Sequence, residues 1–421
     1  MREQVAAALL PGSCSAINIF MDPRHVLEKL QATNPQTEIW WDSAPMVYGN
    51  WAKRVIERAP ADKRRLWDEQ LNRLFDPQHP ERTFFRGVTT NPPLSFGAIK
   101  DDPQFWADFV QKLIRQHPQK NVEQIFWMTY RKVVELGAKL FLPLWEKSRY
   151  AYGYLSGQVD PRDCFDAERM LQQALDIAPI APNVMVKIPG TREGYQVIEE
   201  LTARGIGTNN TLSFTIPQFV ACMDAVEKGL ERAKRNNVDL SRWRSVITHM
   251  TARYGHLGNL KSQAEARGID LSEAEIRWAE LLIFKRAYRL LEERKHPSKM
   301  LICSMRMGPP MPDGSQASWH VEKTAGSNVV YACPPSYIEK LMRAEDQLKP
   351  FKPEAIHEDA PKSFLDKLLR LPYFVQAYEP DGMPRADFNK QTALLATAAE
   401  FSKATLTTVD FIAQQFQILG K

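Results

Sequence analysis

The sequence predicts an α/β protein: a closed parallel (β/α)8 TIM barrel with extra N-terminal, inter-strand and C-terminal helices. Eight short apolar or β-branched runs end in polar residues, and helical patterns separate them. No glycine-rich nucleotide motif supports the alternative, a doubly wound open sheet. In a barrel of this kind the carboxyl ends of the strands share one face, and catalytic groups gather there.

Each of the eight runs has the length of a buried strand. They are Glu38–Asp42, Gly87–Asn91, Tyr154–Gln158, Val184–Lys187, Ile206–Thr211, Val246–Thr248, Met300–Arg306 and Asn328–Cys333. Helical patterns over Tyr195–Arg204 and Ile216–Asn236 follow the fourth and fifth runs, which gives the expected rhythm of strand, helix and strand.

Three stretches exceed what a minimal barrel needs. The basic and aromatic segment Val47–Phe75 reads as an amphipathic helix pair, and the Pro- and Gly-containing segment Met307–Gly314 reads as a loop. Both would leave strand ends on the active face, so they either cover the mouth or decorate the surface. Amphipathic patterns then predict C-terminal helices at Phe364–Leu371, Thr392–Ser402 and Val409–Phe416. We therefore expect residues 1–37 to be an N-terminal extension packed on the barrel, and residues 38–421 to form a single barrel including these helices.

Composition is that of a globular protein with a substantial core. The chain has 421 residues, 44% of them hydrophobic and 25% charged. A net charge of +5 without a basic stripe gives no argument for nucleic-acid binding. Five widely spaced cysteines without a CxxC motif indicate reduced thiols, and no apolar run reaches a membrane span of roughly 18 residues. We expect a cytoplasmic protein that binds neither nucleic acid nor membrane.

Lys187 is the most informative residue, because it lies inside the apolar run Val184–Pro189. Desolvation lowers the pKa of a buried lysine, and the neutral amine can form a Schiff base with a carbonyl. The alternative is structural: a buried lysine often pairs with an acidic neighbour or extends to the surface.

Three segments resemble the transaldolase family: Gly87–Pro93, Val186–Gly194 and Gly205–Phe214. The match from Lys187 to Phe214 has no gap, and recognisable similarity runs from about Glu38 to about Phe416. The resemblance implies a (β/α)8 barrel of carbohydrate metabolism, in the pentose phosphate pathway, with the Schiff-base lysine on the fourth strand.

The resemblance also implies roles for individual residues. Lys187 would form the Schiff base, and Asp42 would be the general acid/base. Gln158 and Thr211 would hold the catalytic water. The remaining matches would bind the substrate, with the two arginines and the serine on its phosphate: Asn91, Asn209, Thr248, Arg253, Ser304 and Arg306.

Two departures from the family pattern matter. Gln158 stands where a Ser-x-Glu-Val-Asp pattern places a glutamate, so an amide replaces a carboxylate. The related fructose-6-phosphate aldolase branch has glutamine there, but it also has a tyrosine where this chain has Met250, which cannot donate a proton. His249 or His320 could supply proton transfer instead, although strand alternation should point His249 toward the helices.

These observations predict a transaldolase-like transferase that moves or cleaves a three-carbon dihydroxyacetone unit of a ketose phosphate. No metal or organic cofactor is expected, because the iminium is the electron sink. One alternative is a diverged Schiff-base aldolase or lyase for an unusual carbonyl substrate in specialised metabolism. A second is a non-catalytic sugar-phosphate-binding subunit. A homodimer is expected by analogy with other barrels.

Overall fold

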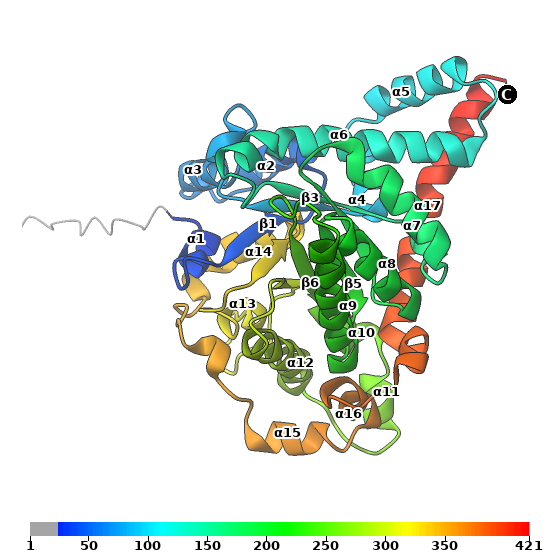
Figure 1. The fold of residues 1–421 in the computed structure, drawn as a ribbon. Helices are drawn as coiled ribbons and strands as arrows, with labels where there is room; N and C mark the ends of the chain where they lie inside the picture. Colours follow the sequence, from blue (N-terminus) through cyan, green and yellow to red (C-terminus); the bar gives the residue numbers. More distant parts are fainter. Residues whose placement is uncertain (1–23, 421) are drawn as a thin grey trace, which may run out of the picture.

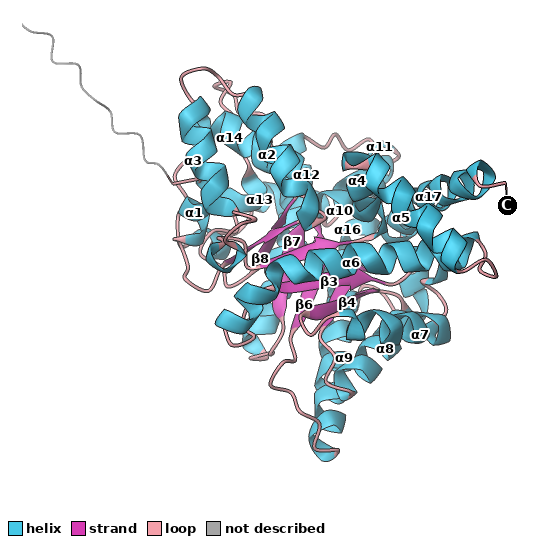
Figure 2. Ribbon diagram, turned by 90° about the horizontal axis from the view of Figure 1, so that it is seen from above, coloured by secondary structure: helices cyan, strands magenta, loops and turns pink. Residues whose placement is uncertain are grey.

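The computed structural model describes residues 24–420, and these residues form the predicted barrel (Figure 1). Neighbouring strands pair in parallel and in chain order, and β1 pairs with β8 to close the ring. Figure 2 shows the strands at the centre and the helices around them. The strands are β1 (Glu38–Trp41), β2 (Gly87–Thr90), β3 (Tyr154–Gln158), β4 (Val184–Pro189), β5 (Thr208–Ser213), β6 (Ser245–Met250), β7 (Lys299–Cys303) and β8 (Val330–Cys333).

The eight predicted runs are confirmed as these eight strands, and their ends differ by a few residues. The largest difference is at β7, which ends at Cys303 rather than Arg306. Ser304 has a φ of 54°, in the left-handed region, and this turns the chain out of the sheet. Arg306 therefore lies outside the sheet, in the segment that follows β7.

Helices surround the barrel and extend beyond it. They are α1 (Val26–Gln31), α2 (Tyr48–Glu57), α3 (Arg64–Leu74), α4 (Pro92–Asp101), α5 (Pro103–Gln116), α6 (Val122–Lys147), α7 (Ala167–Ile177), α8 (Arg192–Ala203), α9 (Ile216–Arg235), α10 (Thr251–Leu257), α11 (Leu260–Glu265), α12 (Glu273–Glu293), α13 (Trp319–Glu322), α14 (Pro335–Ala344), α15 (Lys362–Leu368), α16 (Pro372–Tyr378) and α17 (Thr392–Ile418). Short 3₁₀ helices are η1 (Pro45–Val47), η2 (Pro80–Arg82), η3 (Pro161–Asp163), η4 (Ala178–Ile180), η5 (Glu345–Gln347), η6 (Ala355–His357) and η7 (Arg385–Lys390).

A charged and aromatic cluster fills the amino-terminal end of the barrel. The buried carboxylate of Glu38 accepts hydrogen bonds from Arg244 (2.5 Å), Lys299 (2.7 Å) and the indole of Trp40 (3.0 Å). A side chain at Gly87 would put its Cβ 2.4 Å from the Trp40 ring, so glycine is required there. This end is packed for stability, and the polar chemistry lies at the other end.

Two predictions about the extra segments had different outcomes. The helix pair expected in Val47–Phe75 is confirmed as α2 and α3. The two helices expected at Thr392–Ser402 and Val409–Phe416 are wrong as separate elements, since α17 is continuous across both. The linking residues are mostly polar but contain neither Gly nor Pro, and Thr405 is buried with its hydroxyl bonded to the Phe401 carbonyl (3.0 Å).

Helix α17 lies over the carboxyl ends of the strands. It contacts α4, η3 and α10, which follow β2, β3 and β6, and it also contacts β5 itself. Figure 1 shows it in red along one side of the molecule. Just after the predicted loop Met307–Gly314, Gln316 donates its N–H to the side chain of Gln347 of η5 (3.2 Å).

The described part of the N-terminal extension is fastened to the barrel. Asn34 and Thr37 donate hydrogen bonds to the carbonyls of Gly326 (2.9 Å) and Ser327 (2.7 Å). Residues 1–23, with Cys14, lie outside the described residues. The four described cysteines are free and buried: Cys164, Cys222, Cys303 and Cys333. Within residues 24–420, none of the helices combines the length and apolar character needed to cross a membrane.

Candidate active site

Lys187 lies near the carboxyl end of β4, and only 3% of its surface is exposed. Its register neighbours are Gln158 on β3 and Asn209 on β5. Among the described residues no carboxylate lies within the 4.0 Å of an ion pair with its amine. The structural alternative of a salt-bridged lysine is therefore not what this barrel contains.

Asp42 follows β1 directly and interacts electrostatically with Lys187. Its carboxylate accepts a hydrogen bond from the Thr89 hydroxyl, and its backbone N–H donates to the Cys333 carbonyl (3.1 Å). Burial raises the pKa of Asp42, while Lys187, the Thr89 hydroxyl and Arg253 oppose the rise. The side chain still retains some accessible surface. A carboxyl group with a raised pKa can both give and take a proton, as the predicted role requires.

Two polar side chains at the end of β2, Asn91 and Thr89, have different partners. Asn91 caps α4: its side-chain oxygen accepts the N–H of Leu94 (3.0 Å), and its amide NH₂ can still donate to a ligand. Thr89, which the sequence argument did not single out, is the residue that contacts Asp42. Alternation along β2 places Thr89 on the same face as Asn91, and that signal could have found it.

A chain of buried polar side chains spans β3, β5 and β6. Thr248 donates to the side-chain oxygen of Asn209 (2.8 Å), and the Asn209 amide donates to Ser156 (2.9 Å). All three residues are fully buried. Both ends of the Asn209 amide are therefore held beside the strand that carries Lys187. Ser156 is a further residue that the sequence argument did not single out.

Gln158 is 1% exposed, and its side-chain oxygen has no hydrogen-bond partner among the described residues. Tyr130 of α6 fixes its backbone: the Tyr130 hydroxyl donates to the Gln158 carbonyl (3.0 Å) and accepts the Gln158 N–H (2.7 Å). An unpaired buried amide oxygen is costly, so it favours a donor such as a water or a substrate hydroxyl.

Thr211 lies on β5, on the other side of β4 from Gln158. Its hydroxyl points to the sulfur of Met250 (3.6 Å), and both side chains are buried. Because a thioether accepts hydrogen bonds weakly, this hydroxyl can be recruited by a better partner. Gln158 and Thr211 thus lie on the two strands that flank β4.

The two predicted phosphate arginines both engage carboxylates. Arg253 lies in the first turn of α10 and pairs with Glu400 of α17. The Arg306 guanidinium donates to Glu280 of α12 (3.1 Å) and to His256 of α10 (3.1 Å). Ser304, which precedes Arg306 by two residues, has the left-handed φ described above, a conformation that often marks a functional site.

The two candidate histidines do not stand beside Lys187. His249 points toward the helices, as alternation predicts, and its ring packs against Phe219 and Phe284 at centroid distances of 5.5 and 6.3 Å. Burial lowers the pKa of His249 to about 3. His320 lies on α13 and contacts Glu280 (2.8 Å). A residue that prediction missed is Cys303, whose buried thiol interacts electrostatically with Lys187 and Asp42.

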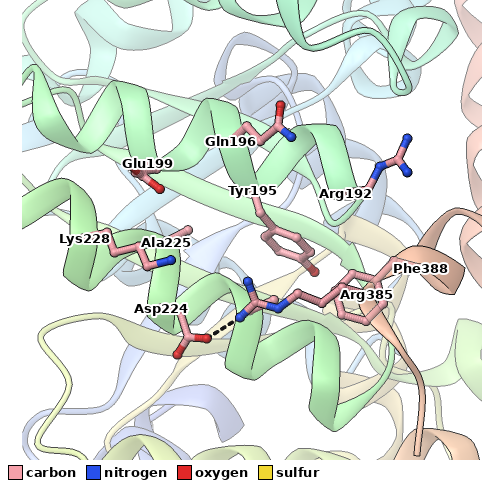
Figure 3. A pocket seen from close by; sticks show the side chains of 10 residues that line it. Arg192, Tyr195, Gln196, Glu199, Asp224, Ala225, Lys228, Arg385 and Phe388 are labelled. Atoms are coloured by element: carbon pink, nitrogen blue, oxygen red, sulfur yellow. Dashed lines mark hydrogen bonds and ion pairs between the residues drawn. The ribbon is translucent and has the colours of Figure 1, made fainter.

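One cavity lies apart from this constellation, between α8, α9 and η7 (Figure 3). Its volume is about 160 Å³ and none of the predicted site residues lines it. Its acidic side chains are already paired, Asp224 with Arg385 and Arg294, and Glu199 with Arg232. Among the described residues, no group of three or more His, Cys, Asp or Glu side chains is arranged to hold a metal ion.

Comparisons with known proteins agree with this geometry. Residues 78–379 match the family described as transaldolase/fructose-6-phosphate aldolase. The chain is 33% identical over 190 residues to a transaldolase of Thiobacillus denitrificans, covering 45% of this chain and 51% of the relative. It is 31% identical over 209 residues to a transaldolase of Arthrobacter sp., covering 49% and 55%. It is 29% identical over 233 residues to transaldolase 2 of Streptomyces coelicolor, covering 55% and 60%.

The matched part of the chain spans about half the length of these curated relatives. The family match begins after β1, so it includes Lys187 and both arginines but not Asp42. Because it extends over more than half of the sequence, and because the barrel is the one expected, we conclude that this chain belongs to the transaldolase/fructose-6-phosphate aldolase family.

Proposed function

We propose that the protein is a transaldolase-like enzyme that forms a Schiff base through Lys187 and moves or cleaves a dihydroxyacetone unit of a ketose phosphate. The observation that carries this proposal is the position of Lys187: it is buried in β4, no carboxylate of the described chain lies within ion-pair distance of its amine, and it interacts electrostatically with Asp42. The family membership and the relatives named transaldolase support the same reaction class.

In the proposed reaction the Lys187 amine attacks the ketone carbon and forms a carbinolamine. Asp42 gives a proton to the departing hydroxyl, which leaves as water, and an iminium remains. Cleavage of the carbon–carbon bond sends its electron pair into the iminium and yields an enamine on Lys187. Asp42 takes the proton of the substrate hydroxyl that becomes the aldehyde, so one carboxyl group serves both steps.

The surrounding amides and hydroxyls would guide these transfers. Gln158 and Thr211 would hold the water that leaves and returns, since one offers a buried unpaired oxygen and the other a weakly engaged hydroxyl. Asn209 and Thr248 would keep the lumen around Lys187 rigid through their mutual hydrogen bond. Arg253, Arg306 and Ser304 would bind the phosphate, and Asn91 would offer its amide NH₂ to a substrate oxygen.

Borohydride reduction in the presence of fructose 6-phosphate, followed by peptide mass analysis, tests the proposal. The expected result is a stable adduct on Lys187 that is lost in Lys187→Met. Lys285 is an internal control, because it is also buried and burial lowers its pKa to about 7, yet backbone carbonyls hold its amine at 2.8 and 2.7 Å. A folded protein with no adduct on Lys187, or with the adduct on Lys285, would refute the proposal.

A second candidate function keeps the lysine and changes the substrate. The amide of Gln158 in place of a carboxylate, together with the thioether of Met250, favours a diverged aldolase or lyase for another carbonyl compound. A Gln158→Glu variant separates the two. A marked gain of transaldolase activity would support the water-holding role of this position. Unchanged activity, with a better rate on other ketones or aldehydes, would favour the second function.

A non-catalytic role as a sugar-phosphate-binding subunit would show itself as phosphate-dependent thermal stabilisation without any imine. Location in the cytoplasm, assembly as a homodimer and a place in the pentose phosphate pathway stay predictions.

A further inference from the structure

Glu280 is a buried carboxylate that the proposed reaction does not use. It lies on α12, and its surface is fully inaccessible. Three donors reach it: Arg277 (2.7 Å), His320 (2.8 Å) and Arg306 (3.1 Å). A buried charge is costly unless it is paired and hydrogen bonded, so this carboxylate fixes the groups that contact it.

His320 joins the same carboxylate to the backbone of Arg306. Its Nδ1 accepts the N–H of Arg306 (3.1 Å), and its Nε2 contacts Glu280. A neutral imidazole has one donor and one acceptor nitrogen, so Nε2 must carry the hydrogen that is donated to Glu280. Burial lowers the pKa of His320, which agrees with the neutral form. Arg306 is thus held at its backbone and at its guanidinium by two bonded neighbours.

Helix α10 connects this network to the mouth of the barrel. His256 accepts a hydrogen bond from Arg306 (3.1 Å) and lies three residues after Arg253, on the same face of the helix. Gly255 permits the close approach, because a Cβ there would lie 2.3 Å from the Glu280 carboxylate. The bond to His256 therefore links Arg306 to the helix that carries Arg253.

We propose that Glu280 and His320 are positioning residues that hold Arg306 ready for the anionic group of the substrate, an inference that rests on the proposed function. A guanidinium has five N–H donors, and the two bonds to Glu280 and His256 leave others for a phosphate. Fixing the long side chain in advance reduces the conformational entropy that is lost on binding.

Glu280→Gln tests this role, because it keeps the shape and removes the charge. We expect KM for fructose 6-phosphate to rise about tenfold, the effect of weakening one charged hydrogen bond, with kcat nearly unchanged. Imine trapping with dihydroxyacetone, which has no phosphate, should be unaffected. Glu275→Gln is the matched control: it is a buried carboxylate on the same helix, it pairs with Lys367, and it does not contact Arg306.

The His320 pair gives a second test that does not depend on Glu280. His320→Phe removes both hydrogen bonds and should raise KM for the phosphorylated substrate. His320→Gln keeps a donor that can reach Glu280 and should restore part of the affinity. An equal rise in KM in both variants would overturn the positioning role, because it would show that the hydrogen bond to Glu280 does not matter for binding.

Thermal stabilisation by inorganic phosphate separates this inference from the reaction itself, since phosphate binding needs no imine. Weaker stabilisation in Glu280→Gln, but not in Glu275→Gln, would support the inference even when the wild-type protein traps no substrate. Equal stabilisation in both folded variants, or loss of dihydroxyacetone trapping in Glu280→Gln, would refute it.

Discussion

Arg253 of α10 forms an ion pair with Glu400 of α17, a residue 147 positions later in the chain. The same guanidinium stacks on the ring of Phe401 at 5.2 Å and partly opposes the rise that burial causes in the pKa of Asp42. An arginine that the sequence assigns to a substrate phosphate thus already has an anionic partner, supplied by the C-terminal helix.

Glu400 should compete with the substrate for Arg253. The carboxylate is 51% exposed, and exposed ion pairs contribute little, so a phosphate can displace it. We expect Glu400→Gln to lower KM for fructose 6-phosphate about two- to fivefold, which corresponds to an ion pair of up to about 1 kcal/mol. Asp410→Asn, at an exposed carboxylate on the same helix, is the control in steady-state kinetics. A higher KM in Glu400→Gln would mean that Glu400 supports the site.

Thr89 should set the pH at which Asp42 ionises. Its hydroxyl donates to the carboxylate and lowers the pKa of Asp42 against the opposing effect of burial. Thr89→Val removes that donor, so the pKa of Asp42 should rise further. The limb of the pH profile of kcat/KM that Asp42 controls should then move to higher pH. Thr90→Val is the control, since the Thr90 hydroxyl donates to the Ser43 carbonyl at 3.5 Å and not to Asp42. An unmoved limb in Thr89→Val would exclude Asp42 as its source.

Asp42→Asn removes the proposed proton carrier. General acid/base catalysis contributes about 10²- to 10⁴-fold, so we expect kcat to fall by at least about a hundredfold while the barrel remains folded. Rates of product formation, together with circular dichroism, check this. If the folded variant retained most of its activity, another group would have to be the general acid/base.

The Tyr130 hydroxyl should stabilise the protein because it holds the backbone of Gln158. Its hydroxyl serves as donor and acceptor for the backbone of Gln158, and Tyr130 is buried. Tyr130→Phe leaves the Gln158 N–H without this partner and should destabilise the protein by about 1–3 kcal/mol. Urea unfolding measures the loss, and a parallel decrease in kcat would show that the backbone of β3 must be held for turnover. Tyr152→Phe, at a partly exposed tyrosine before β3, is the comparison.

His249 should make the protein less stable in acid. Its pKa is about 3 in the folded chain and near 6.5 when unfolded, so the unfolded state binds more protons between these values. Stability is therefore lost as the pH falls below about 6.5, by about 2 kcal/mol from this residue near pH 5. His249→Phe should reduce the fall in melting temperature between about pH 7 and pH 5. His79→Phe, at an exposed histidine, should leave this fall in melting temperature unchanged. An unchanged pH dependence in His249→Phe would contradict a buried neutral ring.

The sequence located the strands well, because each is a short apolar run that ends in polar residues. The segment Tyr154–Gln158 coincides with β3, and Lys187 stands in β4 as expected. It did less well beyond the strands. The left-handed φ at Ser304 ends β7 early, and α17 continues through a mostly polar stretch where two helices were predicted. Nothing in the local pattern marks Ser304 for a positive φ, and the continuous α17 packs against α4, α6 and α10, which are distant in the chain.

By itself, the sequence determined the closed barrel, the buried lysine on its fourth strand and the polar residues at the strand ends, because strand periodicity and the rule of carboxyl-end sites are local properties. Only the tertiary structure decided the partners of those residues. Thr89 on Asp42, Ser156 on Asn209 and Glu400 on Arg253 are contacts between elements far apart in the chain. Hydrogen bonds of this kind form when side chains meet in space, and no spacing along the sequence predicts them.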